Sequence, residues 1–321
     1  MTSQQIEYVL TLAHYKSFSK AAQKLYVTQP SLSQYILGIE KQLGTSLFDR
    51  STSPIRLTEA GEAFVQTAKK IKALEDNLIN ELADMTHLNR GSLKIGASSF
   101  RASCLLARSI ATFCNTYQGI SVSITEDDID QLKTMVKDGE LDVIIGTGNF
   151  DNKYFHTEEL ATERLYLAVA INNPINDRLK EFRLEHADIK NRTLNYLKAK
   201  PIDLIEIAGQ PFVSADHGEF GSTILTSICQ KSGFEPNIVF KVKNLETVFS
   251  LLTANLGVSL IPDTLIRFGN VMSHPYYYML DDTISLNTIS LVSRKSGYFT
   301  NAATEYCLTL KKLVDIGTWR V

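Results

Sequence analysis

The chain has 321 residues, a formal net charge of −2 and a hydrophobic fraction of 44%. This length allows two or more domains, and the composition is typical of a soluble globular protein. No apolar run approaches the ~20 residues of a membrane span, and residues 1–5 lack the basic and apolar segments of a secretory signal. We therefore expect a cytoplasmic protein.

Charge is unevenly distributed along the chain. Residues 1–58 contain six Lys and Arg against three Asp and Glu; six minus three gives +3, so the remainder sums to −5. A basic end on an acidic body favours DNA contact through that end only. The four cysteines form no Cys-x-x-Cys pair and the six histidines no cluster, so we expect no metal site and no cofactor.

Two helices are expected first, over residues 6–15 and 18–25. The apolar positions that recur at helical spacing are Ile6, Val9, Leu10, Leu12 and Ala13, followed by Ala21, Ala22 and Leu25. Ser17 stands where it can cap the second helix. The short break at residues 26–28 is enough to turn the chain into a further helix.

A third helix is expected from Thr28 to about Leu43. Thr28 can cap it, and Pro30 is tolerated in its first turn because the missing N–H would have no helical partner there. Its buried stripe would be Leu32, Ile36, Ile39 and Leu43. The opposite face could reach base edges in the major groove, the alternative being an ordinary solvated face. The candidate DNA contacts are Gln29, Pro30, Ser31, Ser33, Gln34 and Tyr35.

Residues 47–57 predict a two-stranded wing with a polar tip. Its cations could straddle phosphates or enter the minor groove, and the candidate contacts are Arg50, Ser53, Pro54 and Arg56. Residues 58–61 then open the next helix, with Glu59 and Glu62 near its positive end.

These features carry a family resemblance. The segment of residues 17–50 reads SFSKAAQKLYVTQPSLSQYILGIEKQLGTSLFDR, with LTEAG at 57–61, and resembles the winged helix-turn-helix of LysR-type transcriptional regulators. Gly38 and Ile39 depart from the usual pattern, and Gly38 weakens the helix by up to ~1 kcal/mol. The resemblance implies transcription regulation, binding of double-stranded promoter DNA and of a small-molecule effector, and a homodimer or homotetramer. RNA polymerase is a further partner that it allows.

A long helix without proline is expected over residues 58–87. Its apolar stripe is Phe64, Thr67, Ile71, Leu74, Leu78, Leu82 and Met85, as two pairing helices require. The stripe could instead pack on its own domain. The resemblance implies a dimer coiled coil, with a hinge at Asn89, Arg90 and Gly91.

Strand-like and helical runs alternate from Leu93 to Ile261, which predicts a parallel sheet with helices on both faces. The resemblance implies a two-lobed α/β body like a type 2 periplasmic binding protein, with crossing strands near Leu165 and Ile266. The expected domains are a winged helix-turn-helix at 1–58, a linker at 59–90 and an effector-binding domain at 91–321. Within that domain, lobe I would comprise 91–164 and 267–321, and lobe II 165–266. Residues 178–200 are expected to form a surface elaboration.

Ligands in such sheets collect beyond the carboxyl ends of strands, near helix N-termini. The candidate effector-binding residues are Ser98, Ser99, Phe100, Arg101, Thr147, Pro211, Phe212 and Val213, with His217 as a further possibility. Hydroxyls and amides at a helix start suit a carboxylate or another small anion. The alternative is that Ser98 and Ser99 are simply helix caps.

Some members of the family sense oxidants through a cysteine pair. Cys104 and Cys114 lie ten residues apart in one expected helix, a span of ~15 Å that exceeds disulfide reach. Buried packing is therefore our interpretation of both thiols.

Catalytic signatures are missing from the sequence, so we expect no enzyme and no catalytic residue. The alternative function is a solute-binding protein that does not bind DNA. Such a protein would have no need of a basic wing with Arg50 and Arg56. The interpretation favoured by the sequence is a ligand-responsive DNA-binding regulator.

Overall fold

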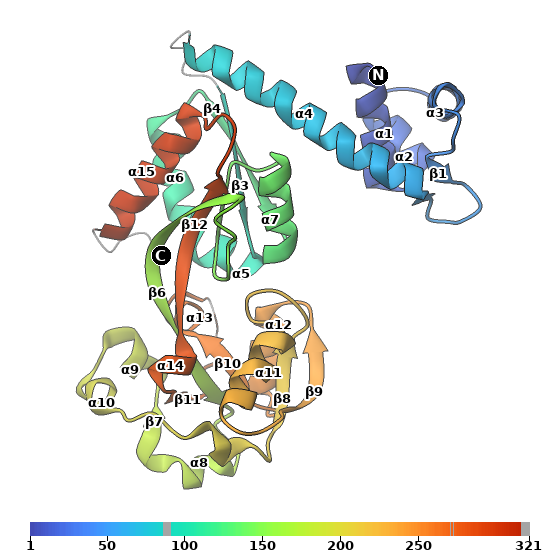
Figure 1. Cartoon of the computed structure of the whole chain (residues 1–321). Coiled ribbons are helices and arrows are strands. Elements are labelled where there is room, and N and C mark those ends of the chain that lie inside the picture. The colour runs from blue at the N-terminus through green and yellow to red at the C-terminus, as the bar shows by residue number, and fades with distance from the viewer. Residues whose placement is uncertain (86–90, 270, 272, 316–321) are drawn as a thin grey trace. The chain divides into compact units, whose positions relative to one another are not determined.

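The computed structural model describes residues 1–85, 91–269, 271 and 273–315 (Figure 1). The chain forms two compact units, one of residues 1–86 with 138–140 and the other of residues 87–137 and 141–321. Each unit is described by itself, the first as the head and the second as the body. Two residues of the expected hinge, Asn89 and Arg90, lie outside the described residues, and Gly91 begins the first strand of the body.

Three short helices build the core of the head: α1 (Ser3–Tyr15), α2 (Phe18–Lys24) and α3 (Gln29–Leu43). Each begins at a hydroxyl side chain that accepts a hydrogen bond from a backbone N–H of the first turn: Thr2, Ser17 and Thr28 in turn. Such a cap contributes typically about 1 kcal/mol to helix stability. The expected helices and the caps Ser17 and Thr28 are confirmed, and α1 begins three residues earlier than the periodicity indicated.

The wing follows, as strands β1 (Phe48–Asp49) and β2 (Arg56–Leu57), which pair antiparallel. Helix α4 (Glu59–Met85) comes next, and Thr58 accepts a hydrogen bond from the Gly61 N–H at 3.0 Å. A Cβ at Gly61 would lie 1.9 Å from the Leu47 carbonyl oxygen. Only glycine therefore lets the first turn of α4 approach the wing this closely.

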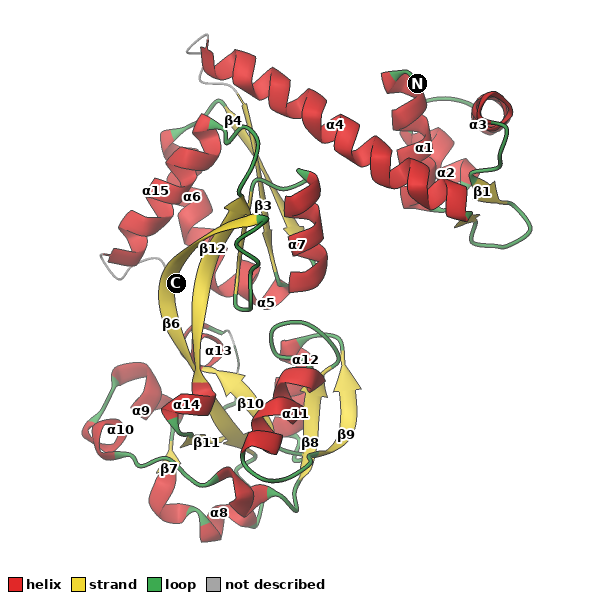
Figure 2. Ribbon diagram, viewed as in Figure 1, coloured by secondary structure: helices red, strands yellow, loops and turns green. Residues whose placement is uncertain are grey.

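Lobe I of the body contains a parallel sheet of β3 (Gly91–Ala97), β4 (Ile120–Glu126) and β5 (Val143–Gly146), with β3 in the middle. Successive side chains of β5 point to opposite faces. Val143 and Ile145 pack with the core that includes α6 (Ala107–Thr116) and α15 (Asn301–Asp315). Ile144 packs instead with residues of α7 (Ile129–Asp138). The helices thus cover both faces of the sheet (Figure 2).

Two long antiparallel strands, β6 (Phe155–Val169) and β12 (Leu286–Arg294), run between the lobes (Figures 1 and 2). Their pairing extends from Arg164 opposite Leu286 to Phe155 opposite Arg294. The expected crossing near Leu165 is observed within β6. The second crossing was placed wrongly, because Ile266 belongs to helix α13 (Asp263–Phe268) and the chain returns only at β12.

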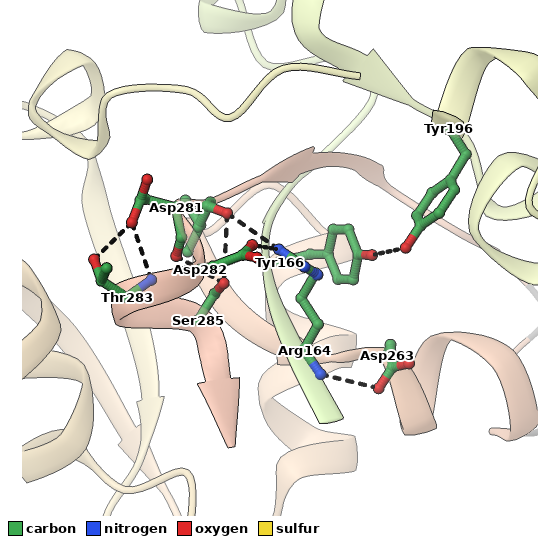
Figure 3. Close-up of polar contacts among 9 residues, drawn as sticks. Arg164, Tyr166, Tyr196, Asp263, Asp281, Asp282, Thr283 and Ser285 are labelled. Atoms are coloured by element: carbon green, nitrogen blue, oxygen red, sulfur yellow. Dashed lines mark hydrogen bonds and ion pairs between the residues drawn. The ribbon is translucent and has the colours of Figure 1, made fainter. Parts of the chain in front are cut away.

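Polar contacts hold the point where the crossing strands enter lobe II (Figure 3). Arg164 of β6 donates to the Asp282 carboxylate at 2.5 Å, and its backbone N–H donates to Asp263 at 3.3 Å. Asp281 caps the short helix α14 (Asp282–Ser285), which leads directly into β12. These bonds connect β6 to the start of α13, through Asp263, and to α14, the short helix that leads into β12, through Asp282.

Lobe II is built on the second half of β6. That half pairs antiparallel with β10 (Ser259–Pro262) and β11 (Tyr276–Met279), and β11 also pairs with β7 (Arg183–Leu184). Strands β8 (Pro211–Ala215) and β9 (Asn237–Val242) pair in parallel and are followed by α11 (Ser222–Lys231) and α12 (Leu245–Thr253), respectively. The expected parallel arrangement therefore holds within β3–β5 and within β8–β9. The crossing strands make the whole sheet mixed.

The segment of residues 178–200 adds small elements to lobe II. It follows α8 (Ile175–Arg178) and contains α9 (His186–Asn191) and α10 (Leu194–Lys198). Leu194 and Leu197 of α10 are exposed, whereas Ile189 of α9 is buried in the body core. The other short helical turns are Ala102–Leu106, Lys180–Phe182 and Leu204–Ile207, and α5 covers Ser99–Arg101.

Candidate nucleic-acid interface and ligand cavity

Helix α3 presents an exposed polar face near its N-terminus. Gln29, Pro30, Ser31 and Gln34 are exposed, while Leu32 and Ile36 are fully buried. The alternation follows from the helical period, which sets the buried stripe on the opposite side. This face therefore has donors and acceptors available to a duplex.

Two of the predicted contacts have partners inside the head. The Tyr35 ring lies 4.6 Å from that of Tyr8, and its hydroxyl donates to Gln4 at 3.2 Å. Arg50 donates to the Glu40 carboxylate at 2.8 Å and lies over the Phe18 ring at 5.2 Å. Both side chains thus contact other residues of the head in the absence of DNA.

Glu40 is the residue of this region that the sequence interpretation missed. Its Oε1 accepts the backbone N–H groups of Leu47 at 2.8 Å and Phe48 at 3.1 Å, and the side chain is only 8% exposed. It connects the C-terminal part of α3 to the start of the wing. The available signal was its place beside Ile39 in the buried stripe, where a carboxylate needs partners.

The wing tip is open to solvent. Ser53, Pro54 and Arg56 are exposed, and a cis peptide bond joins Ser53 to Pro54. Arg56 is a cation of the wing with an exposed side chain, which is the property required for contact with a phosphate. Ser33 is half-buried, within 3.5 Å of Arg50.

The body contains a cavity of about 560 Å³ between its lobes. Four segments line it: the start of α5 (98–100), the end of β4 and the start of α7 (126–129), the turn after β8 (215–220), and the end of β9 with the start of α12 (241–246). Ser98, Ser99 and Phe100 are the predicted effector residues that the structure brings to it. His217 lines it too.

A fully buried ion cluster joins the lobes beside this cavity. The Arg101 guanidinium donates to Glu163 of β6 at 2.8 Å and, through Nε, to Glu219 in the turn after β8. The other Glu219 oxygen accepts the Thr147 backbone N–H at 3.0 Å. Arg101 also lies 5.5 Å from the ring centres of both Phe100 and Phe220.

The electrostatics of the cluster follow from its burial. Desolvation alone would lower the pKa of Arg101, but the Glu163 and Glu219 carboxylates outweigh it and raise that pKa. Burial raises the pKa of Glu219, and Arg101 opposes this. Gly146 makes room for the carboxylate, because a Cβ there would lie 2.3 Å from Glu219 Oε1.

Five predicted effector residues do not line the cavity. Arg101 is buried with its guanidinium bound to Glu163 and Glu219, and Thr147 is buried with its backbone N–H bound to Glu219. Pro211, Phe212 and Val213 belong to strand β8, the last two fully buried in the core. The prediction placed the end of β8 too early in the chain, and the turn at residues 215–220 reaches the cavity instead. Glu219 could not be recognised because its partners come from distant segments.

Within the described residues, no group of three or more His, Cys, Asp or Glu could hold a metal ion. No helix in the described ranges is long and apolar enough to cross a membrane. Burial raises the pKa of Cys104, and raises those of Cys229 and Cys307 to about 12, so these thiols resist ionisation.

Comparisons with known proteins agree across both units. Residues 3–62 match the bacterial regulatory helix-turn-helix protein family, lysR, and residues 86–312 match the LysR substrate binding domain. An uncharacterized HTH-type transcriptional regulator of Bacillus subtilis, YcgK, is 31% identical, the alignment covering 82% of this chain and 80% of the relative. A probable RuBisCO transcriptional regulator of Trieres chinensis is 24% identical, over 94% and 93%.

Solved structures share the fold. The crystal structure of CbnR, a LysR family transcriptional regulator, aligns with a TM-score of 0.66 at 18% identity, covering 97% of this chain and 99% of that one. A full-length variant of OxyR from Pseudomonas aeruginosa aligns with a TM-score of 0.65 at 22% identity, over 100% and 96%. With a winged helix-turn-helix head and a two-lobed substrate-binding body, the chain belongs to the LysR family of bacterial transcriptional regulators.

Proposed function

We propose that this protein binds promoter DNA through α3 and the wing, and adjusts that binding to a small effector held between the lobes. The observation that carries the proposal is the exposed polar face of a capped α3 in the same compact unit as a wing that exposes Arg56. The candidate DNA contacts of α3 are Gln29, Pro30, Ser31, Ser33, Gln34 and Tyr35, and those of the wing, at phosphates or in the minor groove, are Arg50, Ser53, Pro54 and Arg56.

The interlobe cavity supports the sensing step. Its lining comes from both lobes, so a bound molecule would contact lobe I and lobe II at once. A ligand shifts a conformational equilibrium only by its differential affinity for the two states. A ligand that contacts both walls binds the closed arrangement more tightly, because opening the lobes would remove its contact with one wall.

Helix α4 supports self-association. Leu74, Leu78, Ile79 and Leu82 are all more than half exposed on this 27-residue helix. Apolar side chains at spacings of three and four form the seam along which two helices pair. We propose that α4 joins two chains so that two heads reach one operator, and that dimers assemble into a homotetramer in the cytoplasm.

A solute-binding protein without DNA function is the weaker interpretation. It would account for the cavity, but not for an exposed polar face on α3 or for Arg56. The absence of catalytic signatures in the sequence supports a regulator rather than an enzyme.

The test is a comparison of two head variants on operator fragments selected from genomic DNA by the full-length protein. Gln34→Ala should relax sequence preference by about 1–3 kcal/mol if Gln34 reads a base. Arg56→Ala should weaken binding to all fragments similarly and reduce its salt dependence, because one phosphate contact is lost. Affinities are measured by fluorescence anisotropy over a series of salt concentrations.

Lys200→Ala provides the matched control, since Lys200 is an exposed cation of the body that lines no cavity described above. It should leave affinity and salt dependence unchanged. If Gln34→Ala and Arg56→Ala bind like the control, the proposed docking of the head is wrong.

A further inference from the structure

We propose that Glu40 is a positioning residue for DNA recognition, which holds the wing and Arg50 in place beside α3 without contacting DNA itself. This inference rests on the proposed function, because it concerns the same surface of the head. It goes beyond that function by giving a buried acidic residue a role in DNA affinity. By its charge alone, such a residue would oppose the binding of phosphates.

The two oxygens of the Glu40 carboxylate have different partners. Oε1 accepts the backbone N–H groups of Leu47 at 2.8 Å and Phe48 at 3.1 Å, and Oε2 accepts from the Arg50 guanidinium at 2.8 Å. A buried carboxylate is costly unless it is paired and hydrogen-bonded. Both oxygens are satisfied within the head, and a phosphate would be repelled, so we do not assign Glu40 a contact with DNA.

The bonds to Oε1 anchor the first strand of the wing. Phe48 begins β1, and its N–H is one of the two that Glu40 accepts. In the antiparallel pair of β1 and β2, Phe48 lies opposite Leu57 and Asp49 lies opposite Arg56. Arg56 is therefore only one residue pair away from the anchored position. These bonds connect the helix that is proposed to contact bases to the strand that carries an exposed cation.

The bond to Oε2 orients Arg50. Its Nη2 donates to Glu40, its Nη1 lies 3.5 Å from the Ser33 hydroxyl, and the guanidinium lies over the Phe18 ring at 5.2 Å. The Arg50 side chain is nevertheless 34% exposed. A planar guanidinium held at one nitrogen and against a ring has few orientations left. Glu40 thus fixes the exposed part of Arg50 beside Ser33, where candidate contacts of the wing and of α3 meet.

Charge and positioning predict opposite effects of removing the carboxylate. If Glu40 acted only through its charge, Glu40→Gln would tighten DNA binding, because a negative charge near the phosphates is removed. Glutamine has nearly the same shape but only one acceptor oxygen, so it must give up either the backbone N–H groups or Arg50. We therefore expect Glu40→Gln to weaken operator binding by about tenfold or more, the effect of losing a charge-assisted hydrogen bond.

The experiment measures the affinity of full-length variants for the selected operator fragments by fluorescence anisotropy. Glu7→Gln, at an exposed glutamate of α1 in the same head, is the matched control and should bind at least as tightly as the native protein. Melting temperatures of the DNA-free variants verify that the head is folded at the assay temperature. A folded Glu40→Gln variant that binds as tightly as the control would overturn the proposal.

Arg50→Gln tests the same link from the other side and keeps the bonds between Glu40 and the wing backbone. If the two residues act as one unit, the double variant Glu40→Gln with Arg50→Gln should lose no more affinity than the weaker-binding single variant. Independent contributions would instead multiply, to a loss of about a hundredfold, and would contradict the proposal. A general destabilisation of the head would not produce this coupling.

Hydrogen exchange of the DNA-free protein, followed by mass spectrometry, tests the anchor without DNA. Glu40→Ala removes the acceptor of the Leu47 and Phe48 amides, and we expect the segment that contains them to exchange at least about tenfold faster, while α1 keeps its native rate. Equal acceleration in α1 and in the wing would show that Glu40 only stabilises the head, against the proposal.

The outcomes separate this inference from the proposed function. If the native protein selects no DNA fragments, the proposed function is wrong. If it selects fragments and Arg56→Ala weakens their binding while Glu40→Gln does not, only the role assigned to Glu40 is wrong.

Discussion

Arg101 links the two lobes through buried ion pairs. It is fully buried and bound to Glu163 and to Glu219, a residue of the turn after β8. Burying three charges together stabilises a fold less than good apolar packing would. We expect the cluster instead to favour one packing of the two lobes, in which Glu219 reaches both Arg101 and Thr147.

Replacement of Arg101 should therefore be costly. We expect Arg101→Met to lower the free energy of unfolding by about 3–5 kcal/mol, since it leaves two buried carboxylates without their cation. Urea unfolding followed by circular dichroism measures the change. The triple variant that adds Glu163→Gln and Glu219→Gln should recover part of the loss. A single variant within about 1 kcal/mol of the native protein would contradict this account of the cluster.

His274 makes the body sensitive to acid. Its ring stacks on that of His186, with centroids 3.7 Å apart, and its Nδ1 lies 2.8 Å from the Tyr277 hydroxyl. Burial, then His186 and Lys190, lower the pKa of His274 to about 4 from an ordinary value of 6.5. The folded state therefore holds the neutral ring, while the unfolded chain binds a proton below 6.5.

The sign of the pH effect follows. Stability from His274 is present above pH 6.5 and is lost as pH falls from 6.5 toward 4, because the unfolded state binds more protons in that window. We expect the urea midpoint to fall between pH 7 and pH 5, and to fall less in His274→Gln. An equal fall in both proteins would show that other groups cause the pH dependence.

At the scale of elements, the helices of the head follow from local sequence. Hydroxyl caps at Ser17 and Thr28 and the stripe through Leu32 and Ile36 were sufficient to predict α2 and α3. The internal partners of Tyr35 and Arg50 could not be predicted, because Tyr8 and Glu40 come from other turns of the fold. The DNA contacts themselves remain predictions.

Gly38 offers a test of α3 as an element. It lies inside the helix, and a Cβ there would have no atom within 4 Å. Gly38→Ala should raise the free energy of unfolding of the head by about 0.5–1 kcal/mol, because alanine loses less backbone entropy in a helix. Thermal unfolding followed by circular dichroism in the helical band measures the change in stability. Destabilisation would show that an unrecognised constraint acts on this turn.

The crossing strands show where element prediction reached its limit. β6 and β12 pair over most of their length, and their contact joins residues more than a hundred positions apart. Periodicity located the strand at Leu165 but assigned the second crossing to Ile266, which forms a helix. Pairing between strands that lie this far apart in the sequence depends on the tertiary fold, so a local hydrophobic pattern does not predict it.

At the scale of the whole molecule, the hydrophobic cores are separate. The buried core of the head consists of residues from Val9 to Phe48, and the other buried clusters consist of residues from Leu93 to Leu313. The head and the body are separate compact units whose cores share no residues, so each can lose its packing independently. Cooperativity is then expected within each unit rather than across the chain.

We therefore expect two transitions when the full-length protein is heated in a scanning calorimeter. A saturating effector should raise the transition of the body by mass action, by about 2.7 kcal/mol at a hundredfold excess over its Kd. The other transition should respond instead to operator DNA. One transition whose calorimetric and van't Hoff enthalpies agree would refute independent unfolding.

The sequence by itself determined the helix-turn-helix, the wing, the long α4 and most strands and helices of the body, because caps, turns and hydrophobic periods act over a few residues. It also led to the family, through the run from Ser17 to Gly61. Only the tertiary structure decided which polar groups face the cavity. Arg101 and Thr147 were expected to meet a ligand, but Glu219, more than seventy residues away in sequence, binds both. That pairing keeps both residues out of the cavity lining, because contacts between distant segments depend on distances in space that the order of residues does not contain.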